Sequence, residues 1–249
     1  MKCIYLSPSV QQFNEYVNGG NEEQYMNLIA DSVAKYLTAD GICYKRNRPE
    51  MSVGEIIAES NSDNYALHLA IHSNAAPEGL SGEIRGSEVY YYPTSEKSAL
   101  LAQIVKNNLM SIYPNPQDVS TRTTRSFAEL RRTKAPAVLV EVAYHDNEED
   151  ANWIKENIDE IGRVLALSVK EFLDEMCECD IDDDGKTYAR VVTMGGNLNL
   201  REEPNINSKV LDSIPNGTTI EVLDCSGKWY KAIYNGKEGY IFKLYAAII

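Results

Sequence analysis

The first part of the chain alternates between short apolar runs and longer amphipathic stretches. Residues 2–6, 65–71 and 137–141 are apolar runs bounded by polar or turn residues, which is typical of buried strands. Between and after them, apolar residues recur at helical spacing, most extensively from about Glu149 to Met176. Strands that alternate with helices of this length predict an α/β domain with a mostly parallel, twisted sheet flanked by helices.

Local signals predict where the helices begin. Asn21 and Ser95 each precede apolar residues at helical spacing and are good N-caps, while Ser52 and Glu55 have the spacing of a capping box. The stripe after Asn21 consists of Met26, Ile29, Ala30, Val33 and Leu37. We therefore expect helices to start at these three caps, and one continuous helix over about 149–176.

From Tyr188 onward the pattern changes to short β-rich runs separated by Gly, Asn and Pro. Asn-Gly pairs at 216–217 and 235–236 are strong hairpin signals. The sequence predicts a small all-β barrel over 188–249. It also predicts an α/β domain over 1–176 and an acidic linker over 177–187.

Charge limits the partners that the chain can take. The net charge is −13, and residues 188–249 hold 7 Lys+Arg and 6 Asp+Glu, so the first 187 residues carry 17 positive and 31 negative charges. Nucleic acid is therefore not an expected partner, because phosphate neutralisation needs a basic surface. No stretch of 18 apolar residues indicates a membrane span, and the opening Met-Lys-Cys-Ile-Tyr-Leu reads as a first strand rather than an export signal.

The cysteines do not form an evident disulfide framework. There are five, an odd number, and most are isolated within apolar segments. We expect reduced, buried thiols, because disulfide-stabilised domains usually carry a denser and even set of cysteines.

Residues that can bind a metal stand at the predicted strand and helix ends. Glu23 lies in the first turn of a helix, and His72 and Glu141 each end an apolar run. Carboxyl ends of parallel strands meet at one edge of a sheet, so these side chains could converge there. A catalytic zinc site needs about three protein ligands, an open position for water and a nearby carboxylate to move the proton.

At these residues the chain resembles the zinc-dependent N-acetylmuramoyl-L-alanine amidases of bacterial cell walls and phage endolysins. The resemblance covers about residues 2–175. Its matching pieces are Glu23 with Asn27, Ile-His72-Ser-Asn74-Ala, Gly86-Ser-Glu-Val-Tyr-Tyr-Tyr, and Leu130-Arg-Arg-Thr-Lys-Ala-Pro136-Ala-Val-Leu-Val-Glu141 with Asn147 beyond. It implies that Glu23 and His72 bind Zn²⁺ and that Glu141 is the general base. The substrate would be peptidoglycan, cut at the amide between N-acetylmuramic acid and L-alanine.

One departure from the family concerns the first ligand. Where the family usually reads Asp-Pro-Gly-His, this chain reads Ser-Pro-Ser-Val10. Either the site has lost its metal, or another residue supplies the ligand, and we favour His145, four residues after Glu141. His68 is about 13 Å from His72 along the same strand face, too far for joint ligation, and we interpret it as a core histidine. Glu22, beside Glu23, is the competing carboxylate.

The C-terminal segment resembles bacterial SH3 domains, which often bind cell-wall peptides. The shared points are Leu198-Asn-Leu-Arg201, Gly217-Thr, Trp229-Tyr230 and Gly236-Lys-Glu-Gly239-Tyr240. We interpret Trp229 mainly as a core residue of the barrel. The resemblance implies a monomeric enzyme that acts on the bacterial wall. Two alternatives are a catalytically silent peptidoglycan-binding protein and a zinc peptidase that cleaves within the stem peptide.

Overall fold

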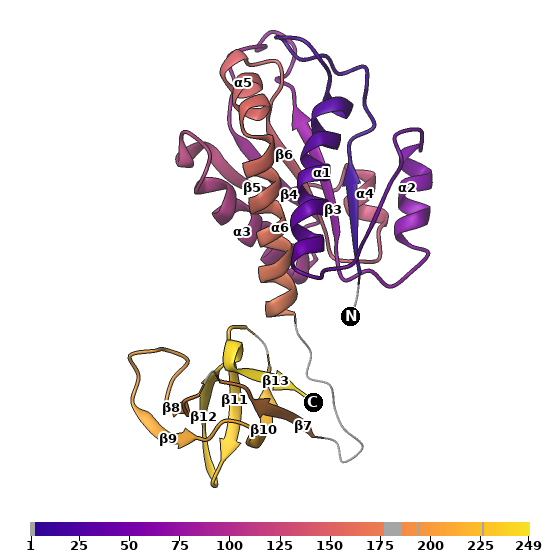
Figure 1. Ribbon diagram of the computed structural model, residues 1–249. Helices are drawn as coiled ribbons and strands as arrows, with labels where there is room; N and C mark the ends of the chain where they lie inside the picture. The colour runs from indigo at the N-terminus through magenta and orange to yellow at the C-terminus, as the bar shows by residue number, and fades with distance from the viewer. Residues whose placement is uncertain (1–2, 177–185, 194, 226) are drawn as a thin grey trace. The chain divides into compact units, whose positions relative to one another are not determined.

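The computed structural model describes residues 3–176, 186–193, 195–225 and 227–249 (Figure 1). The chain divides into two compact units, Met1–Phe172 and Leu173–Ile249. Most of the predicted acidic linker, residues 177–185, lies outside the described residues. Its last residue, Thr187, begins a strand of the second unit.

The first unit is built on a six-stranded sheet in the order β2-β1-β3-β6-β4-β5. All neighbouring strands in it are parallel except β4 and β6, which are antiparallel. The predicted α/β fold with a mostly parallel sheet is confirmed. The strands are β1 (Ile4–Pro8), β2 (Tyr44–Arg46), β3 (His68–Asn74), β4 (Ser87–Tyr91), β5 (Val119–Thr123) and β6 (Ala137–Tyr144).

Helices flank this sheet (Figure 1). They are α1 (Glu22–Ala39), α2 (Val53–Ser60), α3 (Glu96–Met110), α4 (Ala128–Arg132), α5 (Glu148–Glu156) and α6 (Ile158–Glu175), with a short 3₁₀ turn at Pro116–Asp118. Helix α6 packs against α1, where Ser32 donates a hydrogen bond to the Asp159 carbonyl, and against α3, where Asn108 bonds to Ser168. Of the helices in the described ranges, none is long and apolar enough to cross a membrane.

The three predicted helix starts are confirmed by their caps. Asn21 accepts a hydrogen bond from the Gln24 amide, and Ser95 caps α3 in the same way. Ser52 and Glu55 form a complete capping box at α2. These caps satisfy backbone amides that a helix leaves unpaired in its first turn, so they fix where each helix begins.

The expectation of one long helix over about 149–176 was wrong, because the helix breaks at Asn157. Asn157 is the C-cap of α5, and its side-chain amide bonds to the Trp153 carbonyl. Asparagine competes in this way for backbone hydrogen bonds, which disfavours it inside a helix. The apolar spacing continues across the break, so the hydrophobic pattern alone does not reveal it.

The second unit is an antiparallel all-β fold, as predicted. Its seven-stranded sheet has the order β13-β7-β10-β11-β12-β8-β9. Asn235 and Gly236 have positive φ angles of 50° and 72° and join β11 to β12, which is the hairpin geometry that Asn-Gly favours. The strands are β7 (Thr187–Val191), β8 (Leu198–Arg201), β9 (Val210–Ile214), β10 (Thr219–Asp224), β11 (Trp229–Tyr234), β12 (Lys237–Phe242) and β13 (Ala246–Ile248), with a 3₁₀ turn at Lys243–Tyr245.

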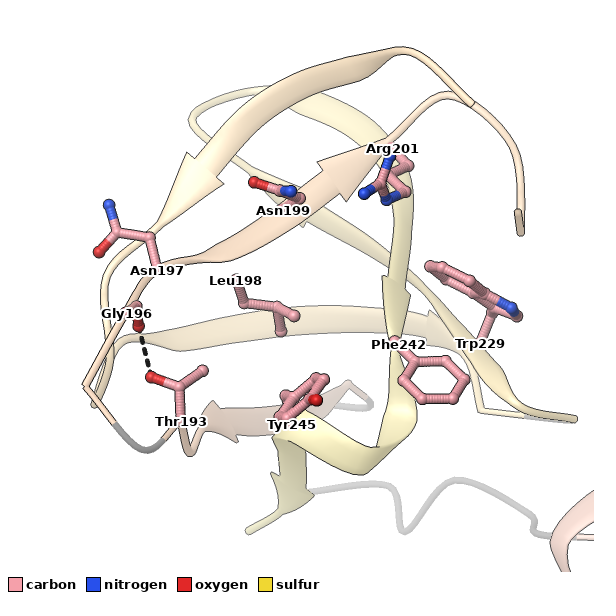
Figure 2. Close-up of a pocket in the computed structure, with 9 residues that line it drawn as sticks. All are labelled: Thr193, Gly196, Asn197, Leu198, Asn199, Arg201, Trp229, Phe242 and Tyr245. Atoms are coloured by element: carbon pink, nitrogen blue, oxygen red, sulfur yellow. Dashed lines mark hydrogen bonds between the residues drawn. The ribbon is translucent and has the colours of Figure 1, made fainter. Parts of the chain in front are cut away.

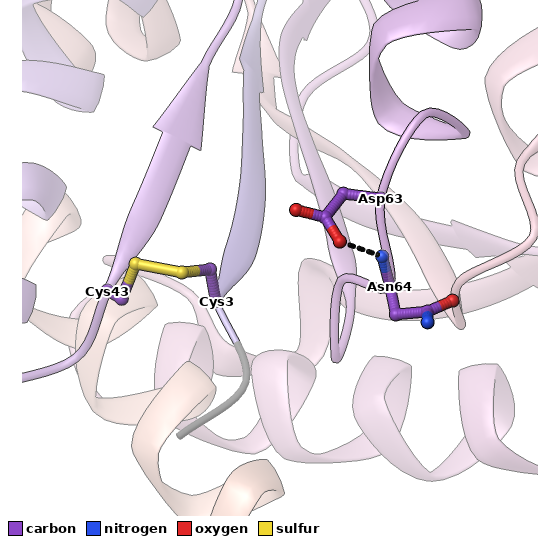
Figure 3. Close-up of a disulfide and its surroundings, with 4 residues drawn as sticks. All are labelled: Cys3, Cys43, Asp63 and Asn64. Atoms are coloured by element: carbon purple, nitrogen blue, oxygen red, sulfur yellow. Dashed lines mark hydrogen bonds between the residues drawn. A yellow bond between two sulfur atoms is a disulfide. The ribbon is translucent and has the colours of Figure 1, made fainter.

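The expectation of reduced cysteines was wrong for three of them. Cys3, before β1, and Cys43, before β2, form a disulfide beside the N-terminal end of the sheet (Figure 3). Cys225 is disulfide-bonded as well. Cys3 and Cys43 are 40 residues apart in sequence, and only the parallel pairing of β1 with β2 brings them together. Such bonds are typical of proteins that work in oxidising surroundings.

Candidate active site

His72 and Glu141 lie side by side on neighbouring strands. They are paired in register between β3 and β6, close to the carboxyl ends of both strands. The pairing becomes irregular between His72 and Asn74, where the sheet ends. Crevices at this edge of α/β sheets are common ligand sites, and the structure brings these two predicted residues together there.

Glu22 is the carboxylate that contacts His72. Its Oε1 lies 2.8 Å from His72 Nδ1, and its Oε2 accepts a hydrogen bond from Asn14. The side chain is buried, with 1% exposed. Burial raises the pKa of Glu22, but His72 and Asn14 outweigh this effect and lower it. Gln11 Nε2 also lies 3.2 Å from His72 Nδ1.

Glu23, the carboxylate that the sequence favoured, is placed differently. It is half-buried, and its backbone carbonyl accepts a hydrogen bond from Asn27. The Asn27 amide also reaches the Ser9 carbonyl, so Asn27 ties α1 to the end of β1. The structure therefore joins Glu22, rather than Glu23, to His72. The position of Glu22 was visible in the sequence, because it lies four residues before Met26 on the same buried stripe.

Glu141 is a buried carboxylate with an unsatisfied oxygen. Its Oε2 has no hydrogen-bond partner among the described residues, which is uncommon for a buried polar atom. Burial raises the pKa of Glu141 to about 7. The cation at His72 opposes this shift, and the carboxylates of Glu22 and Glu88 add to it. Glu88 faces Glu141 in register on the antiparallel strand β4.

His145, predicted as a replacement ligand, contacts Ser73 and Tyr16. Its Nδ1 lies 3.0 Å from both the hydroxyl and the carbonyl of Ser73, and its ring stacks on Tyr16 at a centroid distance of 5.3 Å. Ser73 follows His72 on a strand, where successive side chains point to opposite faces. The structure thus directs the Nδ1 of His145 to Ser73 rather than to the Glu22–His72 pair.

Val10, at the position of the missing family histidine, packs in an apolar cluster. The buried residues of this cluster are Tyr5, Met51 and Ile56. Within the ranges that the structure describes, no group of three His, Cys, Asp or Glu side chains is close enough to hold a metal ion. Glu22 and His72 are therefore two donors of the kind that zinc prefers, one fewer than a catalytic zinc site usually has.

Sequence reasoning missed a second carboxylate beside His72. Glu129, on α4, places its Oε1 3.6 Å from His72 Nε2 and its Oε2 2.8 Å from His68 Nε2. Burial opposes the charge on the His72 ring, but Glu129 and Glu22 raise the pKa of His72 well above its usual value. His68 is fully buried, as predicted. A histidine buried inside an apolar run, such as His68, needs a polar partner. This requirement was the signal in the sequence that a further polar residue would lie nearby.

The second unit contains a pocket of about 260 Å³ (Figure 2). The rings of Trp229 and Phe242, with centroids 5.1 Å apart, form one wall. Trp229 is half-buried and lies outside the buried core cluster of this unit, so its expected core role was wrong. The other lining residues are Thr193, Gly196, Asn197, Leu198, Asn199, Arg201 and Tyr245.

Three buried carboxylates, those of Glu22, Glu129 and Glu141, surround the His72 imidazole at the carboxyl edge of the α/β sheet, a grouping suited to acid–base chemistry. Comparison with family models agrees: residues 11–171 match the N-acetylmuramoyl-L-alanine amidase family, and residues 196–246 match the bacterial SH3 domain. The first match covers more than half of the chain, which therefore belongs to the N-acetylmuramoyl-L-alanine amidase family.

Curated relatives include two cell-wall proteins. The chain is 30% identical over 165 residues to N-acetylmuramoyl-L-alanine amidase LytC of Bacillus subtilis, with 63% of this chain and 32% of LytC covered. It is 27% identical over 140 residues to the probable cell wall amidase LytH of Staphylococcus aureus, with 55% of this chain and 44% of LytH covered. The chain thus spans less than half the length of these two relatives.

Solved structures share the fold of the first unit. The amidase AmiC2 of Nostoc punctiforme is 22% identical, with a TM-score of 0.62 over 69% of this chain and 97% of that chain. An N-acetylmuramoyl-L-alanine amidase from Clostridium difficile 630 is 19% identical, with a TM-score of 0.63 over 71% and 98% of the two chains. At these identities the likeness establishes the fold alone.

Proposed function

We propose that the first unit hydrolyses the amide bond between N-acetylmuramic acid and L-alanine in bacterial peptidoglycan. The observation that carries this proposal is Glu141: a buried carboxylate, paired in register with His72, with a free oxygen and a pKa of about 7. A general base works best when its pKa is close to the working pH. Family membership supports the choice of bond.

In this reaction Glu141 would take a proton from the attacking water and return it to the nitrogen of the leaving L-alanine. The proton affinity that this requires comes from burial and from the neighbouring carboxylates of Glu22 and Glu88. No protein donor competes for the buried Oε2 among the described residues, so this oxygen would accept the proton of a water that enters the site. Glu22 and Gln11 contact the Nδ1 of His72 on β3, the strand next to that of Glu141.

The donors fit zinc in kind, and we propose that Glu22 and His72 would hold it. A carboxylate and an imidazole face each other at 2.8 Å, and the orphaned oxygen of Glu141 adds negative charge nearby. When bound, zinc would polarise the scissile carbonyl and lower the pKa of water. The role predicted for Glu23 passes to Glu22 in this proposal. His145 would be a third ligand only if its ring released Ser73.

For the second unit we propose attachment to the wall through the pocket of Figure 2. Aromatic walls formed by Trp229, Phe242 and Tyr245 favour contact with the faces of sugars or peptide groups. The amides of Asn197 and Asn199 add hydrogen-bonding groups to the same pocket. Such a module would keep the first unit at its polymeric substrate by raising its effective concentration there.

Digestion of purified bacterial peptidoglycan tests the proposed cleavage. We expect the full chain to release peptides with free L-alanine amino termini, detected by amino-terminal labelling and mass spectrometry. Glu141→Gln should reduce the rate by about 100-fold or more, because the amide cannot accept the proton. Glu160→Gln is the matched control and should retain the parental rate, because Glu160 is a half-buried residue of α6 whose partner is Arg163 and not a residue of the site.

A second candidate function is binding of peptidoglycan without cleavage. It is favoured by one observation, the apolar packing of Val10, which leaves two zinc-type donors at the site. A protein of this kind would sediment with purified walls but release no peptides, with or without added zinc. The digestion assay, run beside a sedimentation assay, therefore separates the two candidates.

A further inference from the structure

We infer that Glu129 is a positioning residue for His72 and that His68 holds Glu129 in place. The inference rests on the proposed function only in taking His72 as a residue of the active site. Neither Glu129 nor His68 was a candidate site residue from the sequence. Both belong to a buried polar network that ends at His72, and it is this connection that assigns them a role.

Glu129 bridges the two histidines of β3. Its Oε1 faces His72 Nε2 at 3.6 Å, an ion-pair distance, and its Oε2 faces His68 Nε2 at 2.8 Å. The same Oε2 accepts a hydrogen bond of 2.6 Å from Ser7 on β1. On the far side, His68 Nδ1 lies 2.9 Å from the hydroxyl of Ser60 on α2. Strands β1 and β3 therefore contact the carboxylate directly, and α2 supports His68 behind it.

This network is not needed to fill the core. His68, Ser7 and Ser60 are almost completely buried, and so is Glu129. Moving such an ion pair out of water costs about as much as its attraction returns, and apolar residues of similar size are often equally stabilising. The benefit we assign to the network is orientation of the His72 ring, which apolar residues could not provide.

The order Ser60, His68, Glu129 resembles that of a nucleophilic triad, but its position excludes this role. Ser60 ends α2 and is 1% exposed, and His68 has no exposed surface. A substrate cannot reach the Ser60 hydroxyl, so the network can act only on its neighbours. The neighbour with surface exposure is His72, at 12%.

The two ring nitrogens of His72 therefore have different roles. Nδ1 faces Glu22 and Gln11, while Nε2 faces Glu129. A histidine that binds a metal usually directs its other ring N–H to a carboxylate, which fixes the tautomer and the ring orientation. Glu129 occupies this rear position, so Nδ1 is the nitrogen presented beside Glu22.

The primary test is the ring nitrogen spectrum of His72 in the metal-free full chain. The chain has three histidines, so long-range ¹H–¹⁵N spectra show three imidazoles that His68→Asn and His145→Asn variants would assign. We expect Glu129→Gln to shift the His72 Nε2 signal and broaden its tautomer distribution, and Glu129→Asp to restore it in part. A His72 signal unchanged by Glu129→Gln would overturn the inference.

Two further variants separate positioning from stability. Replacing both charged partners, in Glu129→Leu/His68→Leu, leaves no lone buried charge, so it should fold with a melting temperature near that of the parent. It should nevertheless show the His72 shift and bind zinc ions alone about 10- to 100-fold more weakly. Asp150→Asn, at another buried carboxylate, is the control and should lower the melting temperature without moving the His72 signal.

These readouts also distinguish this inference from the proposed function. If the full chain cleaves no peptidoglycan but Glu129→Gln moves the His72 signal, positioning holds and the amidase proposal fails. If cleavage occurs and the His72 signal in Glu129→Gln equals that of the parent, the amidase proposal stands and the positioning role is rejected. A lower melting temperature alone, with the ring signals unchanged, would show a purely structural role.

Discussion

Nδ1 of His72 lies 2.8 Å from the Oε1 of Glu22, a residue 50 positions earlier in the chain. The contact joins the end of β3 to the first turn of α1. A carboxylate is also stable in that turn because of the helix dipole. The site thus depends on which of two adjacent glutamates faces the sheet.

Variants of these two glutamates test this assignment. We expect Glu22→Gln to weaken binding of zinc ions by more than about 100-fold, since even the loss of an outer partner costs about 10- to 100-fold. Glu23→Gln is the matched control and should bind zinc as the parent does. Competition titrations against a chelator provide the measurement. A larger effect at Glu23 than at Glu22 would restore the role that the sequence predicted for Glu23.

Glu141 should make stability depend on pH. Its folded pKa of about 7 lies above the unfolded value of about 4.3, so the folded chain holds a proton that the unfolded chain releases between these values. Stability should fall as pH rises through this window, and the loss should be complete above about pH 7. Glu141→Gln should therefore be more stable than the parent by roughly 2–4 kcal/mol at pH 8, but not at pH 4. Urea unfolding at both values measures this, and parallel pH profiles would contradict it.

The disulfide between Cys3 and Cys43 should stabilise the first unit. Opening a loop of this length restores entropy to the unfolded chain, so Cys3→Ser/Cys43→Ser should lose about 3–4 kcal/mol. Trp153 in α5 and Trp229 in β11 are the two tryptophans, so a Trp229→Phe background lets fluorescence follow the first unit alone. Equal unfolding midpoints with and without the disulfide would contradict the expectation.

The pocket of the second unit should govern attachment to walls. Trp229→Ala removes an aromatic wall and should weaken sedimentation with purified peptidoglycan by about tenfold, as the loss of a central aromatic contact typically costs 1–2 kcal/mol or more. Ile206→Ala is the control, because Ile206 is exposed and does not line the pocket. An equal loss of sedimentation in Trp229→Ala and Ile206→Ala would show that the pocket does not govern attachment.

Much of the fold follows from short-range signals in the sequence. The caps at Asn21, Ser52 and Ser95 and the apolar runs that end at His72 and Glu141 predict elements that the structure contains. These signals depend on residues a few positions apart, so a single sequence carries them. The helix break at Asn157 was not predicted, because the apolar spacing continues through it.

The site was less accessible to sequence reasoning because its contacts are long-range. Glu129 and His68 are 61 residues apart, and they meet only because the fold places a side chain of α4 against one of β3. Glu22 and Glu23 differ in direction by about 100° around the helix axis. The buried stripe through Met26 indicates that Glu22, rather than Glu23, faces the sheet. The disulfide likewise depends on β1 pairing with β2.

Digestion of peptidoglycan in water enriched with ¹⁸O tests the central claim most directly. Hydrolysis of the amide between N-acetylmuramic acid and L-alanine places the oxygen of water in the lactyl carboxylate of the sugar and a proton on the alanine nitrogen. We therefore predict one ¹⁸O in the lactyl carboxylate of each muramic acid that has lost its peptide in the glycan strand and none in the released peptide, with both products missing in Glu141→Gln. Label in a peptide carboxylate, or no released product from the parent protein, would contradict the account.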